Sequence, residues 1–388
     1  MDIKTTMDTY VAASYGRFPL SLVSGKGACL QDDCGNEYID LGSGIAVNSF
    51  GASDEQWVAA VTAQLATLQH VSNLYYTEPC AKLAELLCTR TGMKKVFFSN
   101  SGAEANECAI KAARRWAFQK YGDESHATVI TLKNSFHGRT MATLSATGQD
   151  HFHTEFGPFL PGFVYADPAS PDELERLAAE NACCAIMFEV VQGEGGVNPL
   201  SEEFVARMKA VAEKYDLLLI CDEVQTGNGR TGQLYGYMNY DLSPDIVSTA
   251  KGLGGGLPIG ATMLGERCEK VFTPGSHGST FGGNPVCCAG ALNVLSRIDD
   301  AMLAEIRAKS EYIISTLTGA KGVKFISGMG LMLGIESERP AGDVIKGCME
   351  RGVLVISAKT KVRLLPPLNI TMQQLEKAVS ILKEELAK

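Results

Sequence analysis

Two short apolar runs in the chain each end in a side chain that could do chemistry. The run at residues 217–221 is followed by Asp222, and the run at residues 246–249 is followed, after one alanine, by Lys251. Each run has the length and composition of a buried strand. Ligands of open α/β sheets bind beyond the carboxyl ends of the strands, so we expect Asp222 and Lys251 to lie in one site.

Asp222 and Lys251 together favour one cofactor. A carboxylate in a buried site is costly unless it meets a cation, and a lysine there can have a lowered pKa and attack carbonyls. Pyridoxal phosphate uses both groups, because a lysine binds it as a Schiff base and an acid faces its protonated pyridine nitrogen. Either residue alone would favour a plain helix cap or a surface lysine, but the pair favours the cofactor.

A candidate anion site lies at residues 100–107, NSGAEANE, directly after another apolar run. Ser101 and Glu104 form a capping box, which predicts that a helix begins here. Gly102 leaves its backbone N–H open, and free N–H groups at a helix N-terminus bind phosphate. An ordinary capped helix is the commoner meaning of this pattern, but the preceding strand and the glycine favour a phosphate site.

Residues 134–140, NSFHGRT, follow a further strand-like run and offer two more ligand-binding side chains. Phe136 could lie flat against an aromatic ring, and Arg139 could hold a carboxylate with two hydrogen bonds. We give His137 no part in proton transfer, because a lone histidine beside an arginine is more often structural.

Later segments add further candidates. Gln225 could donate to a ring hydroxyl, and Val224 could cover the second face of the ring. Glu194 follows a strand end, where a solvated loop carboxylate is a serious alternative. Thr280 could complete the phosphate site, with a turn-rich loop as the alternative. Arg363 stands in a strand-like run, where an arginine usually needs a partner, so we expect a carboxylate whose identity stays open.

The elements that must position these residues form two patterns. Between residues 96 and 265 short apolar runs alternate with helical segments, which indicates a mostly parallel sheet covered by helices. From about residue 280 onward the pattern is that of an α+β module, which we expect to include an N-terminal hairpin at residues 29–41. We therefore expect a large cofactor-binding domain, residues 56–279, and a small domain made of residues 1–55 and 280–388.

The composition is that of an ordinary enzyme: 388 residues, 45% hydrophobic and 20% charged. One hydrophobic core rarely organises a chain of this length. The net charge of -9 argues against a nucleic-acid partner. The first residues show no secretory pattern, and no apolar run is long enough to span a membrane. The twelve cysteines form no CxxC pairs, so we predict no metal site and a reducing cytoplasm.

Six segments together carry a family resemblance. They are NSGAEANE, FHGRT, EVVQGEGG, DEVQTGNGRTG, TAKGLGGGLPIGA and HGSTFGGNP. In order and spacing they resemble the class III, ornithine-type, aminotransferases over essentially the whole chain. The resemblance implies pyridoxal 5'-phosphate as the cofactor and fold type I, with a mostly parallel seven-stranded sheet in the large domain. It also implies a homodimer whose active sites lie at the subunit interface.

The resemblance assigns roles residue by residue. Lys251 matches the lysine that binds the cofactor, and Asp222 matches the acid at the pyridine nitrogen. Gln225 matches the partner of the ring hydroxyl, and Thr280 a threonine that reaches the phosphate of the other subunit. The other cofactor-binding residues are Ser101, Gly102 and Ala103 at the phosphate, and Phe136 and Val224 on the ring. The substrate-binding residues are Arg139, Ser279, Glu194 and Arg363, of which the last two form a pair that opens for 2-oxoglutarate or glutamate.

Within the class, LGSGIAVN, SNLYYTEP and VRLLPPL most resemble the acetylornithine branch. Gly44 stands where ornithine δ-aminotransferases carry a tyrosine, which argues for an acylated substrate. The implied reaction moves the terminal amine of N2-acetylornithine to 2-oxoglutarate, a step of arginine biosynthesis. Succinyldiaminopimelate, succinylornithine and 4-aminobutyrate stay open as substrates, and a non-catalytic regulatory protein is a rival from another class. Residues 49–52, SFGA, depart from a glycine–histidine pair common in the family and leave the site entrance undefined.

Overall fold

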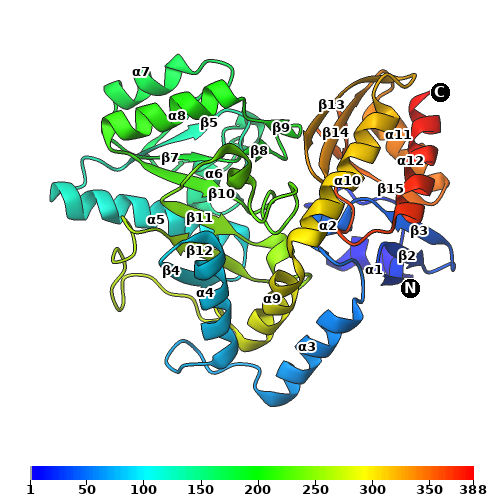
Figure 1. Cartoon of the computed structure of the whole chain (residues 1–388), viewed down its shortest axis with the longest axis horizontal. Coiled ribbons are helices and arrows are strands. Elements are labelled where there is room, and N and C mark those ends of the chain that lie inside the picture. The colour runs from blue at the N-terminus through cyan, green and yellow to red at the C-terminus, as the bar shows by residue number, and fades with distance from the viewer. Residues whose placement is uncertain (1) are drawn as a thin grey trace.

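A seven-stranded sheet forms the centre of the larger part of the molecule (Figure 1). The computed structural model describes residues 2–388. Neighbouring strands run parallel except at β12, which is antiparallel to β11 and β4. In sheet order the strands are β4 (Lys95–Ser99), β12 (Gly260–Leu264), β11 (Ile246–Thr249), β10 (Leu218–Asp222), β7 (Cys183–Phe188), β5 (Thr128–Leu132) and β6 (Phe163–Ala166).

Helices cover both faces of this sheet, because successive strand residues point to opposite sides. Leu218 and Ile220 of β10 pack in one buried cluster with helix α5 (Gly102–Tyr121). Leu219 and Cys221 pack in a second cluster with residues of α7 (Asp172–Glu180) and α8 (Glu202–Tyr215). The strands are therefore buried on both faces, as their continuous apolar runs predict.

Helices α3 (Glu55–Thr67) and α4 (Glu78–Thr91) both pack against α9 (Pro285–Arg297), and α4 also packs against β4. The Asn284 side chain accepts from the first N–H groups of α9, and Gly92 ends α4 with a φ of 76°. The remaining short segments of this part are α6 (Met141–Ala146), η1 (Asp150–Phe152), β8 (Val191–Gln192), β9 (Asn198–Pro199), η2 (Gly236–Tyr240) and η3 (Lys251–Leu253).

The smaller part of the molecule holds both chain ends and two four-stranded sheets (Figure 1). One sheet has the order β13-β14-β17-β16, and in the other β15 pairs in parallel with β3, which joins the C-terminal region to the N-terminal hairpin. Its strands are β1 (Leu22–Lys26), β2 (Cys29–Asp32), β3 (Glu37–Asp40), β13 (Val323–Met329), β14 (Met332–Ser337), β15 (Val353–Leu354), β16 (Ile356–Ala358) and β17 (Lys361–Leu364). Its helices are α1 (Ile3–Tyr10), α2 (Ser43–Ala46), α10 (Asp300–Leu317), α11 (Ala341–Glu350) and α12 (Met372–Leu386).

The expected architecture is confirmed: a mostly parallel seven-stranded sheet with a smaller α+β part built from both termini. The hairpin at residues 29–41 is present as β2 and β3. The boundaries at residues 55/56 and 279/280 stay a prediction. The strand β6, a short edge strand whose residues are mostly half-buried, was not predicted from the sequence.

Among residues 2–388, no helix is both long enough and apolar enough to cross a membrane. Every one of the twelve cysteines is free, and seven of them are buried, as expected for small apolar side chains.

Candidate active site

Asp222 and Lys251 lie at the carboxyl ends of two adjacent parallel strands. Asp222 ends β10 and stands opposite Ser248 of β11, three residues before Lys251. Lys251 has a φ of 45°, a conformation that non-glycine residues rarely adopt. Within the described part of the chain its Nζ has no hydrogen bond and no ion pair. Burial lowers the pKa of Lys251, and Arg363 lowers it further against the opposing effect of Glu194.

The Asp222 carboxylate is buried and held by three donors. Oδ2 accepts from Asn106 Nδ2 at 2.7 Å and faces His137 Nδ1 at 2.8 Å, and Oδ1 accepts from the Val224 N–H at 3.0 Å. Ser248 Oγ in turn donates to Asn106 Oδ1 at 2.5 Å. These contacts fix the carboxylate at the strand end, and the fixed geometry suits an acceptor that must face one ligand atom.

Ser101 is the N-cap of α5, as the sequence predicts. Its Oγ accepts from the Glu104 N–H at 3.1 Å, while Glu104 Oε2 accepts from the Asn100 N–H at 2.8 Å. A Cβ on Gly102 would lie 2.6 Å from Val224 Cγ1, so only glycine fits between the helix start and the loop after β10. The start of α5, whose first N–H groups belong to Gly102 and Ala103, therefore lies against Val224, which donates its own N–H to Asp222.

Phe136 and Arg139 lie on the loop after β5. The Phe136 N–H donates to Glu189 Oε2 at 2.9 Å, and burial together with the nearby Asp222 raises the pKa of Glu189 well above its usual value. Arg139 is exposed and lies over two aromatic rings, 4.0 Å from the centroid of Phe152 and 5.5 Å from that of Phe136. It forms no ion pair with any residue between 2 and 388.

Arg363 of β17 has the carboxylate partner that its strand position requires, and the partner is Glu194. Nη1 of Arg363 lies 2.7 Å from Glu194 Oε1, and Nη2 lies 3.4 Å from Oε2. Burial would raise the pKa of Glu194, but the charge and hydrogen bonds of Arg363 outweigh it and lower that pKa. Gln225 joins the pair, because its Nε2 donates to Glu194 Oε1 at 3.3 Å and its Oε1 accepts from Arg363 at 3.2 Å.

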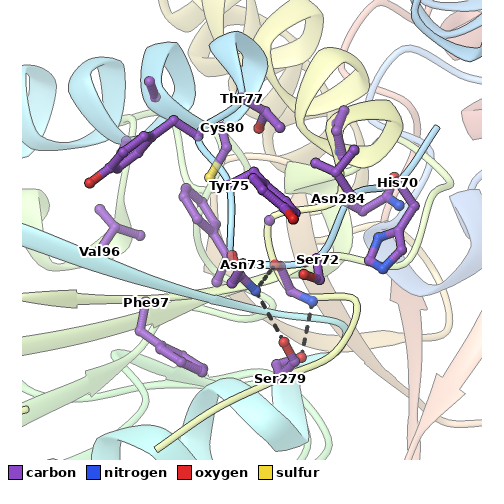
Figure 2. A pocket seen from close by; sticks show the side chains of 18 of the residues that line it. His70, Ser72, Asn73, Tyr75, Thr77, Cys80, Val96, Phe97, Ser279 and Asn284 are labelled. Atoms are coloured by element: carbon purple, nitrogen blue, oxygen red, sulfur yellow. Dashed lines mark hydrogen bonds between the residues drawn. The ribbon is translucent and has the colours of Figure 1, made fainter. Parts of the chain in front are cut away.

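Ser279 and Thr280 lie on the loop before α9, beside a pocket of about 510 Å³ that is lined by neither Asp222 nor Lys251. Asn73 donates to the Ser279 carbonyl at 3.1 Å (Figure 2), and Asn100 Nδ2 donates to Ser279 Oγ at 3.2 Å. Thr280 is exposed. The loop thus touches the strand end that precedes α5, while Thr280 points to solvent in the single chain.

The segment at residues 43–46 and the departure at residues 49–52 border the same region. The four residues from Ser43 to Ala46 all have positive φ, between 43° and 64°. Ser49 Oγ donates at 3.0 Å to the carbonyl of Gly252, next to Lys251, and Phe50 is buried. The SFGA departure is therefore a packed part of the site wall.

Comparison with known proteins agrees with this geometry. The family model "Aminotransferase class-III" matches residues 10–386. An acetylornithine aminotransferase of Haemophilus ducreyi is 48% identical over 99% of this chain and 98% of its own. The corresponding protein of Aquifex aeolicus is 44% identical over 97% of this chain and all of its own.

The chain belongs to the class III aminotransferases.

Solved structures of two aminotransferases have the same fold. N-acetylornithine aminotransferase of Stenotrophomonas maltophilia superposes with a TM-score of 0.85 at 32% identity, covering 99% of this chain and 98% of that one. Ornithine aminotransferase of Toxoplasma gondii superposes with a TM-score of 0.95 at 31% identity, covering 99% and 94%.

Pyridoxal phosphate is the cofactor of this class III aminotransferase. The residues present fit it, because a lysine amine without a partner in residues 2–388, a fixed buried carboxylate and a helix N-terminus lie together at one edge of the sheet. Asn106 was not predicted from the sequence, and His137 was expected to be structural; both contact the Asp222 carboxylate directly. A polar residue on the buried face of α5 was the available signal for Asn106.

Proposed function

We propose that this class III aminotransferase moves the terminal amine of N2-acetylornithine to 2-oxoglutarate, giving N-acetylglutamate 5-semialdehyde and glutamate. The reaction is a step of arginine biosynthesis. The names of the relatives from H. ducreyi, A. aeolicus and S. maltophilia support the substrate. The observation that carries the proposal is the ion pair, at 2.7 Å, between the buried Arg363 and the half-buried Glu194.

The ion pair accounts for a site that must accept two different substrates in turn. Acetylornithine presents one carboxylate and a neutral acetamide, whereas glutamate and 2-oxoglutarate present two carboxylates. Arg139, exposed and without a carboxylate partner among residues 2–388, is the fixed cation for the shared carboxylate. Arg363 is masked by Glu194 for acetylornithine and is released for the second carboxylate of glutamate. Ser279 contributes a hydroxyl to the substrate side of the site.

Lys251 and Asp222 carry the chemical step. The bound cofactor supplies an electron sink for the charge left on the substrate carbon when its proton is removed. Lys251 Nζ takes that proton and returns it one position along, as general base and then general acid. Its lowered pKa favours the neutral amine that this role needs. Asp222, fixed by Asn106 and His137, keeps a proton on the pyridine nitrogen.

The remaining assigned residues hold the cofactor in place. Ser101, Gly102 and Ala103 bind the phosphate at the start of α5. Phe136 and Val224 would cover the two faces of the ring, and the Gln225 amide, which contacts Glu194, would donate to the ring hydroxyl. Thr280, exposed in the single chain, completes the phosphate site of a second subunit, so the active unit is a homodimer. We assign the enzyme to the cytoplasm, a compartment that suits a chain with twelve free cysteines.

A panel of amino donors assayed with 2-oxoglutarate tests the substrate. N2-acetylornithine should give the highest kcat/KM, ahead of succinylornithine, succinyldiaminopimelate and 4-aminobutyrate. A donor that exceeds it by about tenfold, or 1.4 kcal/mol in transition-state binding, would reassign the substrate. A protein that binds the cofactor but shows no change of visible absorbance with any donor would be the non-catalytic rival.

A further inference from the structure

A buried lysine beside the Glu194–Arg363 pair has no carboxylate partner between residues 2 and 388. Lys361 stands two residues before Arg363 on β17, so both side chains leave the same face of the strand. It is 6% exposed, and its Nζ donates to Asn198 Oδ1 at 2.9 Å and to Ser327 Oγ at 2.7 Å. A buried ammonium is costly unless its acceptors are fixed, so these two contacts define where Lys361 can lie.

Asn198 extends the contact of Lys361 to the turn that carries Glu194. Its Nδ2 donates to the carbonyl of Gly195 at 2.9 Å, and Gly195 directly follows Glu194 in the turn between β8 and β9. Glu194 pairs with Arg363, and Arg363 lies on the same strand, β17, as Lys361. The contacts therefore form a closed ring that ties the turn of the larger part to a strand of the smaller part.

The space for Lys361 is built into the neighbouring strand. Gly334 of β14 stands opposite Arg363 in the sheet register. A Cβ on Gly334 would lie 3.1 Å from Lys361 Cδ and 2.9 Å from Val197 Cβ. Because Gly334 has no side chain, the lysine stem and Val197 pack together over β14. The Lys361 ammonium also lies 4.7 Å from the ring centroid of Phe325.

The turn that carries Glu194 is strained and needs restraints. Val197 has a φ of 54° and is fully buried, although β-branched residues strongly disfavour this region. Such a conformation persists only where the surrounding structure holds it. Asn198 directly follows Val197, and its hydrogen bond to the Gly195 carbonyl spans Val197. This bond and the bond from Lys361 to Asn198 supply part of that restraint.

We infer that Lys361 is a positioning residue that, through Asn198, holds Glu194 in the position that masks Arg363. It thereby sets how strongly the site favours a monocarboxylate over a dicarboxylate. The inference rests on the proposed function, in which the masking of Arg363 separates the two substrates. Loss of the Lys361–Asn198 contact leaves Arg363 unmasked for more of the time, so dicarboxylates bind more tightly and monocarboxylates bind as before.

Equilibrium binding of two unreactive ligands to the holoenzyme tests this role without any turnover. Glutarate is a dicarboxylate that resembles glutamate without its amine. N-acetylnorvaline is acetylornithine without its terminal amine and carries one carboxylate. Isothermal titration calorimetry gives the Kd of each ligand for the wild-type enzyme and for the variants Lys361→Met and Asn198→Leu.

Both variants should bind glutarate about three- to tenfold more tightly, because a masked state supported by one hydrogen bond fewer is less populated. The Kd of N-acetylnorvaline should change by less than about twofold, because the masked state still predominates. The sign of the glutarate change is informative. If Lys361 acted only as a positive charge, Lys361→Met would weaken glutarate binding and Asn198→Leu would leave it unchanged, and that result would overturn the inference.

Two further variants separate positioning from general stability. Lys309→Met removes another buried lysine, 5% exposed, whose Nζ donates to the carbonyl of Leu368 at 3.0 Å, and it should lower the Tm without changing the ratio of the two Kd values. In a Glu194→Gln background, Lys361→Met should no longer change glutarate binding, since it acts through Glu194. A full effect of Lys361→Met on glutarate binding in that background would overturn the inference. An unchanged ratio of the two Kd values in Asn198→Leu would also overturn it, because Asn198 is exposed and its replacement should not disturb the fold.

The variant Arg363→Ala distinguishes a failure of the proposed function from a failure of the role assigned to Lys361. It should weaken glutarate binding and spare N-acetylnorvaline. If it spares both ligands, the masking pair of the proposed function is wrong and the role of Lys361 is overturned with it. If it weakens glutarate while Lys361→Met and Asn198→Leu match the wild-type enzyme, only the role of Lys361 is overturned.

Discussion

At the scale of single residues, the two central side chains of the site, Asp222 and Lys251, differ in their hydrogen-bond partners. Asp222 is buried with three hydrogen-bond donors, whereas Lys251 has no protein partner among the described residues. A satisfied carboxylate stays where the protein holds it, and an unsatisfied amine is free to react. This asymmetry explains why one residue orients a ligand and the other exchanges protons.

The Asp222→Asn variant tests the fixed charge. The amide keeps the shape but cannot hold a proton on the pyridine nitrogen, so kcat should fall by about three orders of magnitude. Asp245→Asn, at the opposite end of β11, is the matched control, because its carboxylate accepts from the Leu219 N–H and from Arg267, both away from the site. Steady-state kinetics and a thermal melt of both variants make the comparison. Near wild-type turnover in Asp222→Asn would remove the role of this residue.

The lowered pKa of Lys251 predicts a pH dependence of apoprotein stability. The folded state binds a proton on Lys251 less readily than the unfolded chain does. Between the lowered pKa and the ordinary lysine pKa of 10.5, the unfolded chain holds more protons, so the stability of the apoprotein rises with pH. Urea unfolding of wild-type and Lys251→Met apoprotein should show a stability gap that changes across this window. A constant gap would contradict the shift.

The sequence made some of these residues predictable and hid others. Asp222 and Lys251 follow apolar runs whose length marks strands, so their common location follows from the sheet rule. Asn106 and His137 gave no comparable signal, because a buried polar residue on a helix or loop is usually structural. Glu194 and Arg363 are 169 residues apart in the chain, and no spacing rule connects them. Their pairing was therefore predicted only from the family resemblance.

At the scale of elements, the site depends on how closely the start of α5 approaches the loop after β10. A Cβ on Gly102 would meet Val224 at 2.6 Å, so the approach requires glycine. Gly102→Ala should push the two segments apart and weaken cofactor binding by about tenfold or more, in line with the cost of overpacking. Absorbance after dialysis measures the retained cofactor.

Gly342→Ala is the matched control for Gly102→Ala. Gly342 lies in α11 and a Cβ there would meet nothing within 4 Å, so this variant should retain the cofactor and keep or gain stability. Equal cofactor loss in the two variants, or none in either, would show that the contact between Gly102 and Val224 does not shape the phosphate site.

The elements themselves were largely predictable, and the exceptions have physical causes. Strands buried on both faces are continuous apolar runs, which made six of the central strands visible. The edge strand β6 was not predicted although its four residues, FVYA, are apolar, because so short a run does not by itself distinguish a strand from other buried segments. The ring from Lys361 to Asn198 was not predictable, because it depends on the register of β17 against β14 and on a strained turn at Val197.

At the scale of the whole molecule, large apolar side chains near the Thr280 loop lack cover in the single chain. Leu74 is 85% exposed, Tyr75 is 70% exposed and Phe281 is 60% exposed. Exposed apolar surface of this kind marks an interaction surface. It adjoins the loop that carries Thr280, which agrees with a homodimer in which this loop serves the neighbouring site.

Complementation of two variants tests the shared site. Lys251→Ala should be inactive, and Thr280→Ala should hold the phosphate more weakly. In a mixed dimer, the subunit with intact Lys251 receives its threonine from the other subunit, so one complete site forms. Mixing the variants should restore activity above either alone. Lack of any gain, with mixed dimers verified by mass spectrometry, would mean that Thr280 serves its own chain.

The central claim is that one site accepts two substrates by masking Arg363, and single-turnover spectra of the separate half-reactions test it most directly. Arg363→Ala should slow the reaction with glutamate by about a hundredfold, because the second carboxylate loses its charged partner, and should leave the reaction with N2-acetylornithine within about threefold of wild type. Arg139→Ala should slow both. Equal slowing of the two half-reactions by Arg363→Ala would contradict the account and leave Arg363 as a structural partner of Glu194.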